Sequence, residues 1–120
     1  MPRSLTFDTV RRIGLELSDV EVGTMYGSPA LKVRGKMFVC MATNKAAEPN
    51  TLAVRMAFAD RDALIAEAPD TYYLKDHYVD YPCVLVRLSR VQPDALRDLV
   101  RGAWRFVGAA APAKKPKRRR

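Results

Sequence analysis

The fold of this 120-residue chain is decided by the stretch Thr24-Met-Tyr-Gly-Ser-Pro-Ala-Leu-Lys-Val-Arg-Gly-Lys-Met-Phe-Val-Cys-Met41. Its alternation predicts a β-hairpin with strands Ala30–Arg34 and Met37–Met41. The turn falls at Gly35-Lys36, or one residue earlier at Arg34-Gly35, because glycine supplies the positive φ that tight hairpin turns need. The hairpin therefore anchors the prediction of an antiparallel sheet.

Either turn position divides the hairpin into the same two faces. One face is wholly apolar and is the predicted core, formed by Leu31, Val33, Phe38 and Cys40. The other face mixes basic and apolar side chains and is the predicted open surface, formed by Ala30, Lys32, Arg34, Met37, Val39 and Met41. This second face is the clearest functional signal in the folded part of the sequence.

The remaining pattern predicts three helices around further strands. The helices are expected at Phe7–Leu17 with Thr6 as N-cap, from Asp60 to just before Pro69, and from Pro93 to a C-cap at Gly108. The strands are expected at Val20–Thr24, Thr51–Met56 and Cys83–Leu88, with Arg55 pointing outward. Runs of strands between helices predict an α+β fold with two layers, an antiparallel sheet with helices packed on one face.

The net charge of +8 is concentrated at the C-terminus. Six of the last seven residues are cationic: Lys114, Lys115, Lys117, Arg118, Arg119 and Arg120. Without them the chain has 15 basic and 13 acidic residues. The sequence therefore predicts a folded domain over residues 1–108 and a disordered basic tail over residues 109–120. Such a tail is typical of segments that bind nucleic-acid phosphates.

Composition also limits the compartment and the chemistry. The chain has no apolar run near the ~20 residues of a membrane span and no secretory signal pattern, so we expect a cytoplasmic protein. Cys40 and Cys83 lie singly in apolar runs, which predicts two core thiols. Their spacing does not suit zinc, a cytoplasmic setting argues against a disulfide, and we expect no metal and no cofactor.

Two further clusters are read as mainly structural. Tyr72, Tyr73, Tyr78 and Tyr81 surround the single histidine, His77, and more often pin a loop than stack on bases. A dyad of His77 with Asp76 or Asp80, completed by Ser28 or Cys83, stays open on sequence grounds, although we expect no enzyme. In the third helix Arg97, Arg101 and Arg105 form a ridge that Asp94 and Asp98 can pair with, a typical solvated helix face.

Two motifs resemble those of the MmcQ/YjbR-like family of small bacterial proteins. They are Tyr26-Gly-Ser-Pro-Ala-Leu-Lys-Val-Arg-Gly-Lys-Met-Phe38 and His77-Tyr-x-x-Tyr-Pro-x-Val-Leu-Val-Arg-Leu88. The resemblance covers about Phe7 to Val107. It implies a compact α+β domain with a double-wing DNA-binding motif and a frataxin-like shape, and it brings no catalytic residues. The acidic ridge of frataxins is not matched, because Arg11 and Arg12 stand beside Asp8 and Glu16.

Together these patterns predict weak, largely sequence-independent binding of nucleic acid, DNA in the first place, by a monomer or weak homodimer. The expected contact residues are Lys32, Arg34, Lys36, Arg55 and Arg87 on the sheet, with Lys114, Lys115, Lys117, Arg118, Arg119 and Arg120 in the tail. The alternative is a protein-interaction or small-ligand domain that uses the Met37, Val39 and Met41 side chains.

Overall fold

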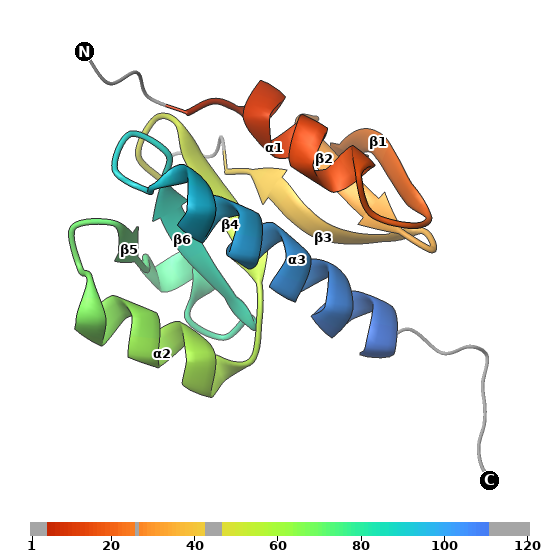
Figure 1. Ribbon diagram of the computed structural model, residues 1–120. Coiled ribbons are helices and arrows are strands. Elements are labelled where there is room, and N and C mark those ends of the chain that lie inside the picture. The colour runs from red at the N-terminus through yellow and green to blue at the C-terminus, as the bar shows by residue number, and fades with distance from the viewer. Residues whose placement is uncertain (1–4, 26, 43–46, 111–120) are drawn as a thin grey trace, which may run out of the picture.

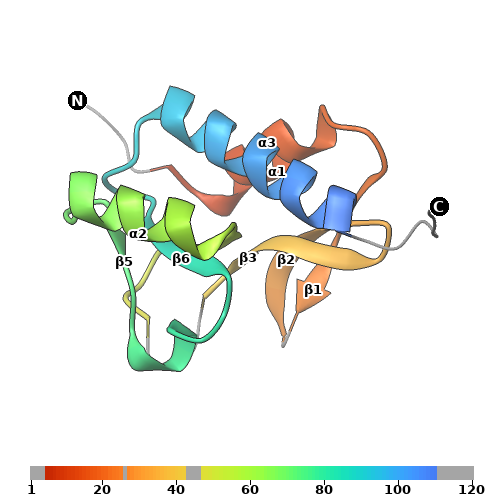
Figure 2. The same cartoon turned by 90° about the horizontal axis from the view of Figure 1, so that it is seen from below.

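A computed structural model describes residues 5–25, 27–42 and 47–110 of the chain. It shows two layers, a six-stranded antiparallel sheet with three helices on one face (Figures 1 and 2), which confirms the predicted fold class. The strand order is β1-β2-β3-β4-β6-β5. The strands are β1 (Val20–Met25), β2 (Ser28–Val33), β3 (Lys36–Met41), β4 (Thr51–Arg55), β5 (Tyr72–Tyr73) and β6 (Cys83–Arg87). The helices are α1 (Phe7–Leu15), α2 (Phe58–Glu67) and α3 (Pro93–Ala110), with a short 3-10 helix at Asp76–Tyr78.

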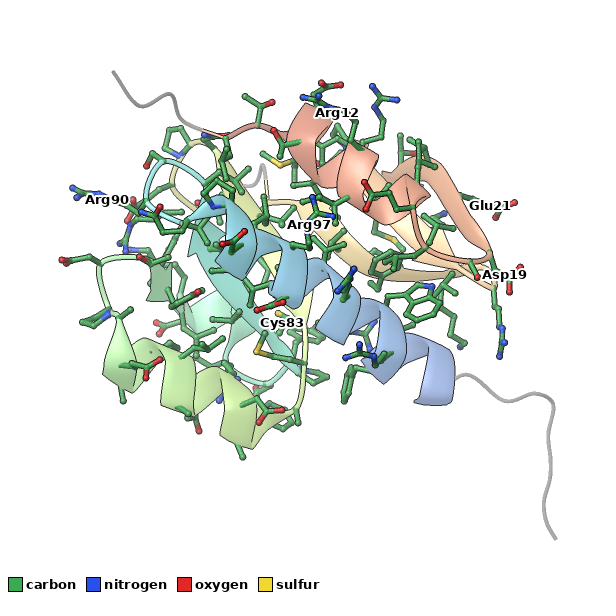
Figure 3. The ribbon with its side chains drawn as sticks, in the orientation of Figure 1. Arg12, Asp19, Glu21, Cys83, Arg90 and Arg97 are labelled. Atoms are coloured by element: carbon green, nitrogen blue, oxygen red, sulfur yellow. The ribbon has the colours of Figure 1, made fainter. Side chains whose placement is uncertain are left out.

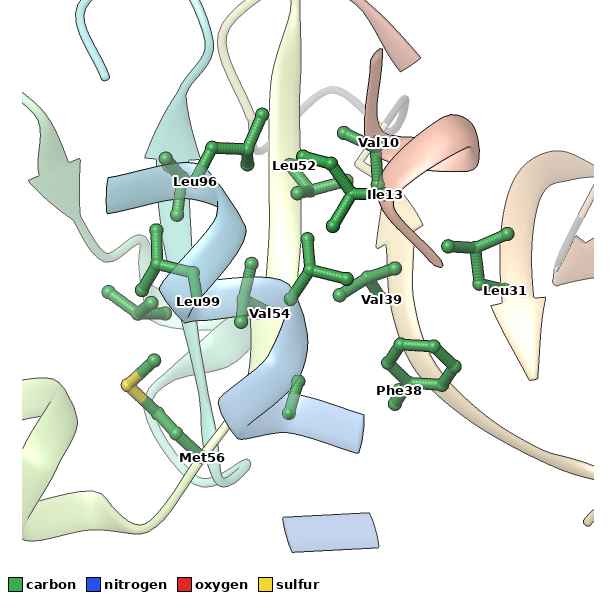
Figure 4. Packing of buried hydrophobic residues seen from close by; sticks show 14 of the residues in the cluster. Val10, Ile13, Leu31, Phe38, Val39, Leu52, Val54, Met56, Leu96 and Leu99 are labelled. Carbon is green, nitrogen blue, oxygen red and sulfur yellow. The ribbon is translucent and has the colours of Figure 1, made fainter. Parts of the chain in front are cut away.

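The main core lies between the sheet and the helices. Figure 4 shows Phe38, Val39, Leu52 and Val54 of the strands packed toward Leu96 of α3, and Phe38, Val39, Leu52 and Val54 are fully buried. Burial of each such side chain contributes roughly 1.5–3 kcal/mol. Burial of these side chains therefore holds the helices on this one face of the sheet.

Helix α1 approaches the sheet closely because it carries a glycine at the contact. A Cβ built on Gly14 would overlap Cδ1 of Leu31, far inside van der Waals contact. Val10 and Ile13 of the same helix are buried beside it, as their helical spacing predicts. Any larger residue at position 14 would require the Leu31 side chain or α1 itself to shift.

The β2–β3 hairpin differs from its prediction in the facing of its side chains. The turn lies at Arg34-Gly35, with φ of 53° and 81°, the positive values of a type I′ turn. Lys32 pairs with Met37 but Leu31 pairs with Val39, so Phe38 is the extra residue of a bulge. A bulge turns two successive side chains to the same side, and here both point to the core.

The bulge corrects three predicted positions. Val39 is fully buried in the main core and Met41 packs against that core, whereas both were predicted to lie on the open face. Cys40, predicted in the core, instead joins a second cluster on the far face of the sheet. Strict alternation placed these residues wrongly because one inserted residue reverses the facing of everything beyond it.

Helix ends also differ from the prediction. Helix α1 ends at Leu15 rather than Leu17, and α2 begins at Phe58 rather than Asp60, with Ala57 in the N-cap position. Helix α3 continues past Gly108 to Ala110, because the alanines after Gly108 are strong helix formers. The predicted disordered tail lies mostly outside the described residues, and its two first positions are helical.

Among residues 5–25, 27–42 and 47–110, no helix combines the length and the apolar character that crossing a membrane requires.

Candidate nucleic-acid interface

The far face of the sheet, turned away from the helices, is not the open surface that the sequence predicted. Ala30, Thr51, Ala53 and Leu85 lie on this face and are at most 5% exposed. The partly buried side chains packed against this cluster are Met25, Met37, Ala47 and Tyr78. The sequence correctly predicted which side chains of β4 point away from the helices. The far face to which they point is nevertheless covered by neighbouring side chains and loops.

Arg87 is occupied by protein contacts on this covered face. Its Nε and Nη2 donate to Oε1 and Oε2 of Glu48 at 2.9 and 2.7 Å, a two-pronged ion pair. Its Nη1 donates to the main-chain oxygens of Pro69 and Asp70. The guanidinium carbon lies 4.2 Å from the ring centroid of Tyr73. The hydrogen bond from Arg87 lowers the pKa of Glu48 below its usual 4.5 and raises the pKa of Arg87 itself.

Tyr73 continues this network and joins three segments. Its hydroxyl shares a 2.6 Å hydrogen bond with Oγ1 of Thr51 and accepts one from the main-chain N–H of Glu48 at 2.9 Å. The pinning role predicted for the tyrosine cluster is therefore confirmed at Tyr73. Tyr72 is also buried, and burial raises the pKa of its phenol. The side chain of His77 lies outside the described part, so the open dyads stay predictions.

Arg55 is half-buried on the same face. Its Nη1 donates weakly to the main-chain oxygen of Met37 at 3.4 Å, and its Nε is buried without a hydrogen-bond partner among the described residues. The two thiols, from Cys40 and Cys83, lie near it on the same face. Burial raises the pKa of Cys40 to about 11 and raises that of Cys83 as well, so both thiols stay protonated near neutral pH.

The predicted cations of the hairpin have a different environment. Arg34 and Lys36 flank Gly35 at the tip and are exposed, while Lys32 is half-buried on β2. None of these three side chains forms an ion pair with a residue that the structure describes. Glu21 of β1 lies opposite Lys32 in the register and reduces the local positive charge.

Helix α3 carries two more exposed cations. The C-terminal end of α3 and the β2–β3 turn lie at one end in both views (Figures 1 and 2). Arg101 lies in the middle of α3 and Arg105 in its C-terminal half; both are exposed and make no ion pair within the described ranges. Arg97 instead donates to Oε1 of Glu16 on α1 at 2.8 Å, which corrects its predicted pairing with Asp94.

We call the side chains of Lys32, Arg34, Lys36, Arg101 and Arg105 the basic end. Figure 3 shows Asp19 and Glu21 at this end of the molecule as well, so two carboxylates reduce its positive charge. Sequence reasoning noticed the arginine ridge of α3 but did not join it to the hairpin. The joining depends on the diagonal course of α3 over the sheet, which no local pattern in the sequence encodes. The predicted tail cations lie outside the described residues, beyond the end of α3.

No three His, Cys, Asp or Glu side chains of the described ranges come together as a metal site. The alternative interaction face of Met37, Val39 and Met41 loses its basis, because the bulge places Val39 and Met41 on the helix side.

Comparison with known proteins identifies the family. The model of the YjbR family matches residues 15–106. The chain therefore belongs to the YjbR family, which confirms the resemblance seen in the two motifs.

A solved structure shares the fold. The crystal structure of Deinococcus radiodurans protein DR2400, of the domain family DUF419, superposes with a TM-score of 0.76 over 92% of this chain and 84% of the other. The two sequences are 20% identical, so this likeness establishes the shared fold.

Relatives by sequence are similar over a shorter stretch. The uncharacterized proteins Rv2570 of Mycobacterium tuberculosis and Mb2600 of Mycobacterium bovis are each 43% identical to this chain over 42 residues. That segment is 35% of this chain, and it spans 33% of the length of each relative.

Proposed function

We propose that this protein binds nucleic acid, DNA in the first place, weakly and with little sequence preference. The proposed contacts are the basic end and the cationic segment Lys114–Arg120. One observation carries the proposal: Arg34 and Lys36 are exposed at the β2–β3 turn without ion pairs to described residues, and that turn lies at the same end of the molecule as the C-terminal end of α3, which leads toward that segment. The double-wing DNA-binding motif implied by the family resemblance supports the same reading.

The chemistry of the basic end suits phosphates rather than bases. Exposed lysine and arginine side chains neutralise phosphates and release counterions, an interaction that carries little sequence information. Arg55 and Arg87 are left out of the proposed interface, because both guanidiniums are engaged on the covered face. The proposal assumes a cytoplasmic protein and includes no catalytic step.

The proposal is tested by titrating labelled duplex DNA, single-stranded DNA and RNA at several salt concentrations. Full-length protein is compared with protein truncated after Ala110 and with the triple variant Lys32→Ala, Arg34→Asn, Lys36→Ala. Six neutralised phosphates correspond to a slope of log K against log salt of about −5. Because the cationic segment need not engage all its charges at once, we expect truncation to flatten the slope by about 3–5 and the triple variant by about 2–3.

A matched control removes three exposed cations from other places, with Arg12→Ala, Lys75→Ala and Arg90→Ala. This control should change the slope by much less than the hairpin variant. Equal losses in both triple variants would show that net charge, and not the basic end, determines binding. Unchanged affinity after truncation at low salt would remove the cationic segment from the proposal.

A further inference from the structure

The start of α2 and the loop before β6 form an exposed apolar patch. Phe58 is 45% exposed, Val79 44% and Tyr81 57%. Single exposed apolar residues are ordinary, but these three are held together by one side chain, which contacts the ring of Phe58 and the main-chain oxygens of Val79 and Tyr81. Figure 1 shows the loop that leads into β6 beside the start of α2.

The side chain at the centre is Arg61, which is only 8% exposed. Its Nη1 donates to the main-chain oxygens of Val79 at 2.9 Å and Tyr81 at 3.3 Å. Its guanidinium carbon lies 4.7 Å from the ring centroid of Phe58. One buried cation therefore fixes the loop and the first turn of α2 together and keeps the three apolar side chains at the surface. We call Phe58, Val79 and Tyr81 the aromatic patch.

Acidic residues border the aromatic patch. Asp60 and Asp62 follow Phe58 on α2, and Asp80 lies between Val79 and Tyr81, all three exposed. Nε of Arg61 donates to Asp62 at 2.9 Å, so that guanidinium is already neutralised. In a protein of net charge +8 this region is locally acidic. Such a border repels phosphates and attracts cations.

We propose that the aromatic patch binds a peptide segment rich in lysine and arginine. Tyrosine and phenylalanine rings attract ammonium and guanidinium groups, and arginine stacks on such rings while pairing with nearby carboxylates. The rings of the aromatic patch and the carboxylates of its border thus complement the side chains and the charge of a cationic peptide. The protein as a whole repels such a peptide, so binding has to come from a local site. This role goes beyond nucleic-acid binding and does not depend on it.

The probe is a fluorescent peptide with the sequence of residues 112–120, Pro-Ala-Lys-Lys-Pro-Lys-Arg-Arg-Arg. Its anisotropy is measured with full-length protein at low salt, and a peptide with every lysine and arginine replaced by glutamine serves as the uncharged comparison. We expect Tyr81→Ala to weaken binding at least fivefold and Tyr81→Phe to retain it. We expect Asp80→Asn to weaken binding about threefold with an intact far-ultraviolet circular dichroism spectrum.

Matched controls remove similar groups from elsewhere on the surface. Leu15 and Val22 are exposed apolar residues outside the patch, and Asp94 is an exposed carboxylate on α3. Leu15→Ala, Val22→Ala and Asp94→Asn should leave the peptide affinity unchanged. If Tyr81→Ala fails to fold, Asp80→Asn decides the question alone, because it changes one exposed atom.

Three outcomes would overturn the proposal. The first is no binding of the cationic peptide, and the second is binding that neither Tyr81→Ala nor Asp80→Asn reduces. The third is a patch that stacks on bases: Tyr81→Ala would then weaken DNA binding while Asp80→Asn strengthened it. Loss of DNA binding in the hairpin triple variant, by contrast, concerns only the proposed nucleic-acid function.

Discussion

Arg87 is the last residue of β6 and Arg34 directly follows β2 in the same sheet, and their surroundings are opposite. Arg87 is held by a carboxylate, two main-chain oxygens and an aromatic ring on the covered face. Arg34 stands at the tip of the β2–β3 hairpin, exposed and without an ion pair to any described residue. The same residue type thus serves as a structural clamp at one place and as an available cation at the other.

The difference between these arginines shows what makes a cation available for a partner. Facing outward from a strand is not sufficient, because loops can cover that face and use the charge internally. At the hairpin tip no element packs over the turn, so the charge remains exposed. Electrostatic arguments about binding therefore need the loop contacts as well as the strand pattern.

The largest expected effect tests the facing of β3 itself. Phe38→Ala should reduce the free energy of unfolding by ~3–5 kcal/mol, because a fully buried ring leaves a cavity. Val39→Ala should reduce the free energy of unfolding by about 2 kcal/mol, because the bulge turns Val39 toward the same core as Phe38. A Val39 on an open outward face, as the sequence predicted, would make Val39→Ala nearly neutral, and a urea denaturation series distinguishes the two cases.

A second prediction measures how well the far face is covered. With a pKa of about 11 against 9.0 for a free thiol, Cys40 carries roughly 100-fold less thiolate in the folded protein. We therefore expect Ellman's reagent to modify Cys40 in a Cys83→Ser variant at least ~100-fold more slowly in native buffer than in denaturant. Similar rates in both conditions would mean that this face is open to solvent.

The third prediction compares the two arginines directly. Arg87→Ala should destabilise the fold by ~1–3 kcal/mol, because it leaves two carbonyls and a carboxylate without their charged donor. Arg34→Asn should stay within ~0.5 kcal/mol, since asparagine tolerates the positive φ and the side chain is exposed. In DNA binding the order should reverse, with Arg34→Asn the weaker binder. If Arg87→Ala loses more DNA binding than Arg34→Asn at equal folded fraction, the DNA interface lies on the sheet face, as the sequence predicted.

The sequence predicted most of the architecture and less of the candidate site. Helical spacing at Val10 and Ile13 and alternation in β4 follow from local periodicity, and both were confirmed. The bulge at Phe38 was missed because an inserted residue leaves no mark in the pattern of apolar residues. The clamp on Arg87 was missed because Glu48 comes from a loop 39 positions away. That the β2–β3 turn and the C-terminal end of α3 lie at one end of the molecule depends on how α3 crosses the sheet.

The smallest expected effect is the pH dependence of the clamp. Glu48 has a lowered pKa in the folded protein and its usual value, near 4.5, in the unfolded chain. The unfolded state therefore binds more protons between these two values, and stability rises with pH across that window. The contribution of the Glu48–Arg87 pair is present above about pH 4.5 and is lost as the pH falls through the lowered pKa of Glu48.

Glu48→Gln keeps the shape of the side chain but removes this titration. We expect its free energy of unfolding to depend less on pH below 4.5 than that of the wild-type protein, and to differ little in slope above pH 6. The matched control is Asp8→Asn, which removes the lowered pKa of an exposed carboxyl paired with Arg11 on α1. If Asp8→Asn and Glu48→Gln reduce the pH dependence of the free energy of unfolding below pH 4.5 by the same amount, the clamp on the far face contributes no more to it than an exposed ion pair does. If only Glu48→Gln does so, the Glu48–Arg87 pair of the clamp is the main source of this pH dependence.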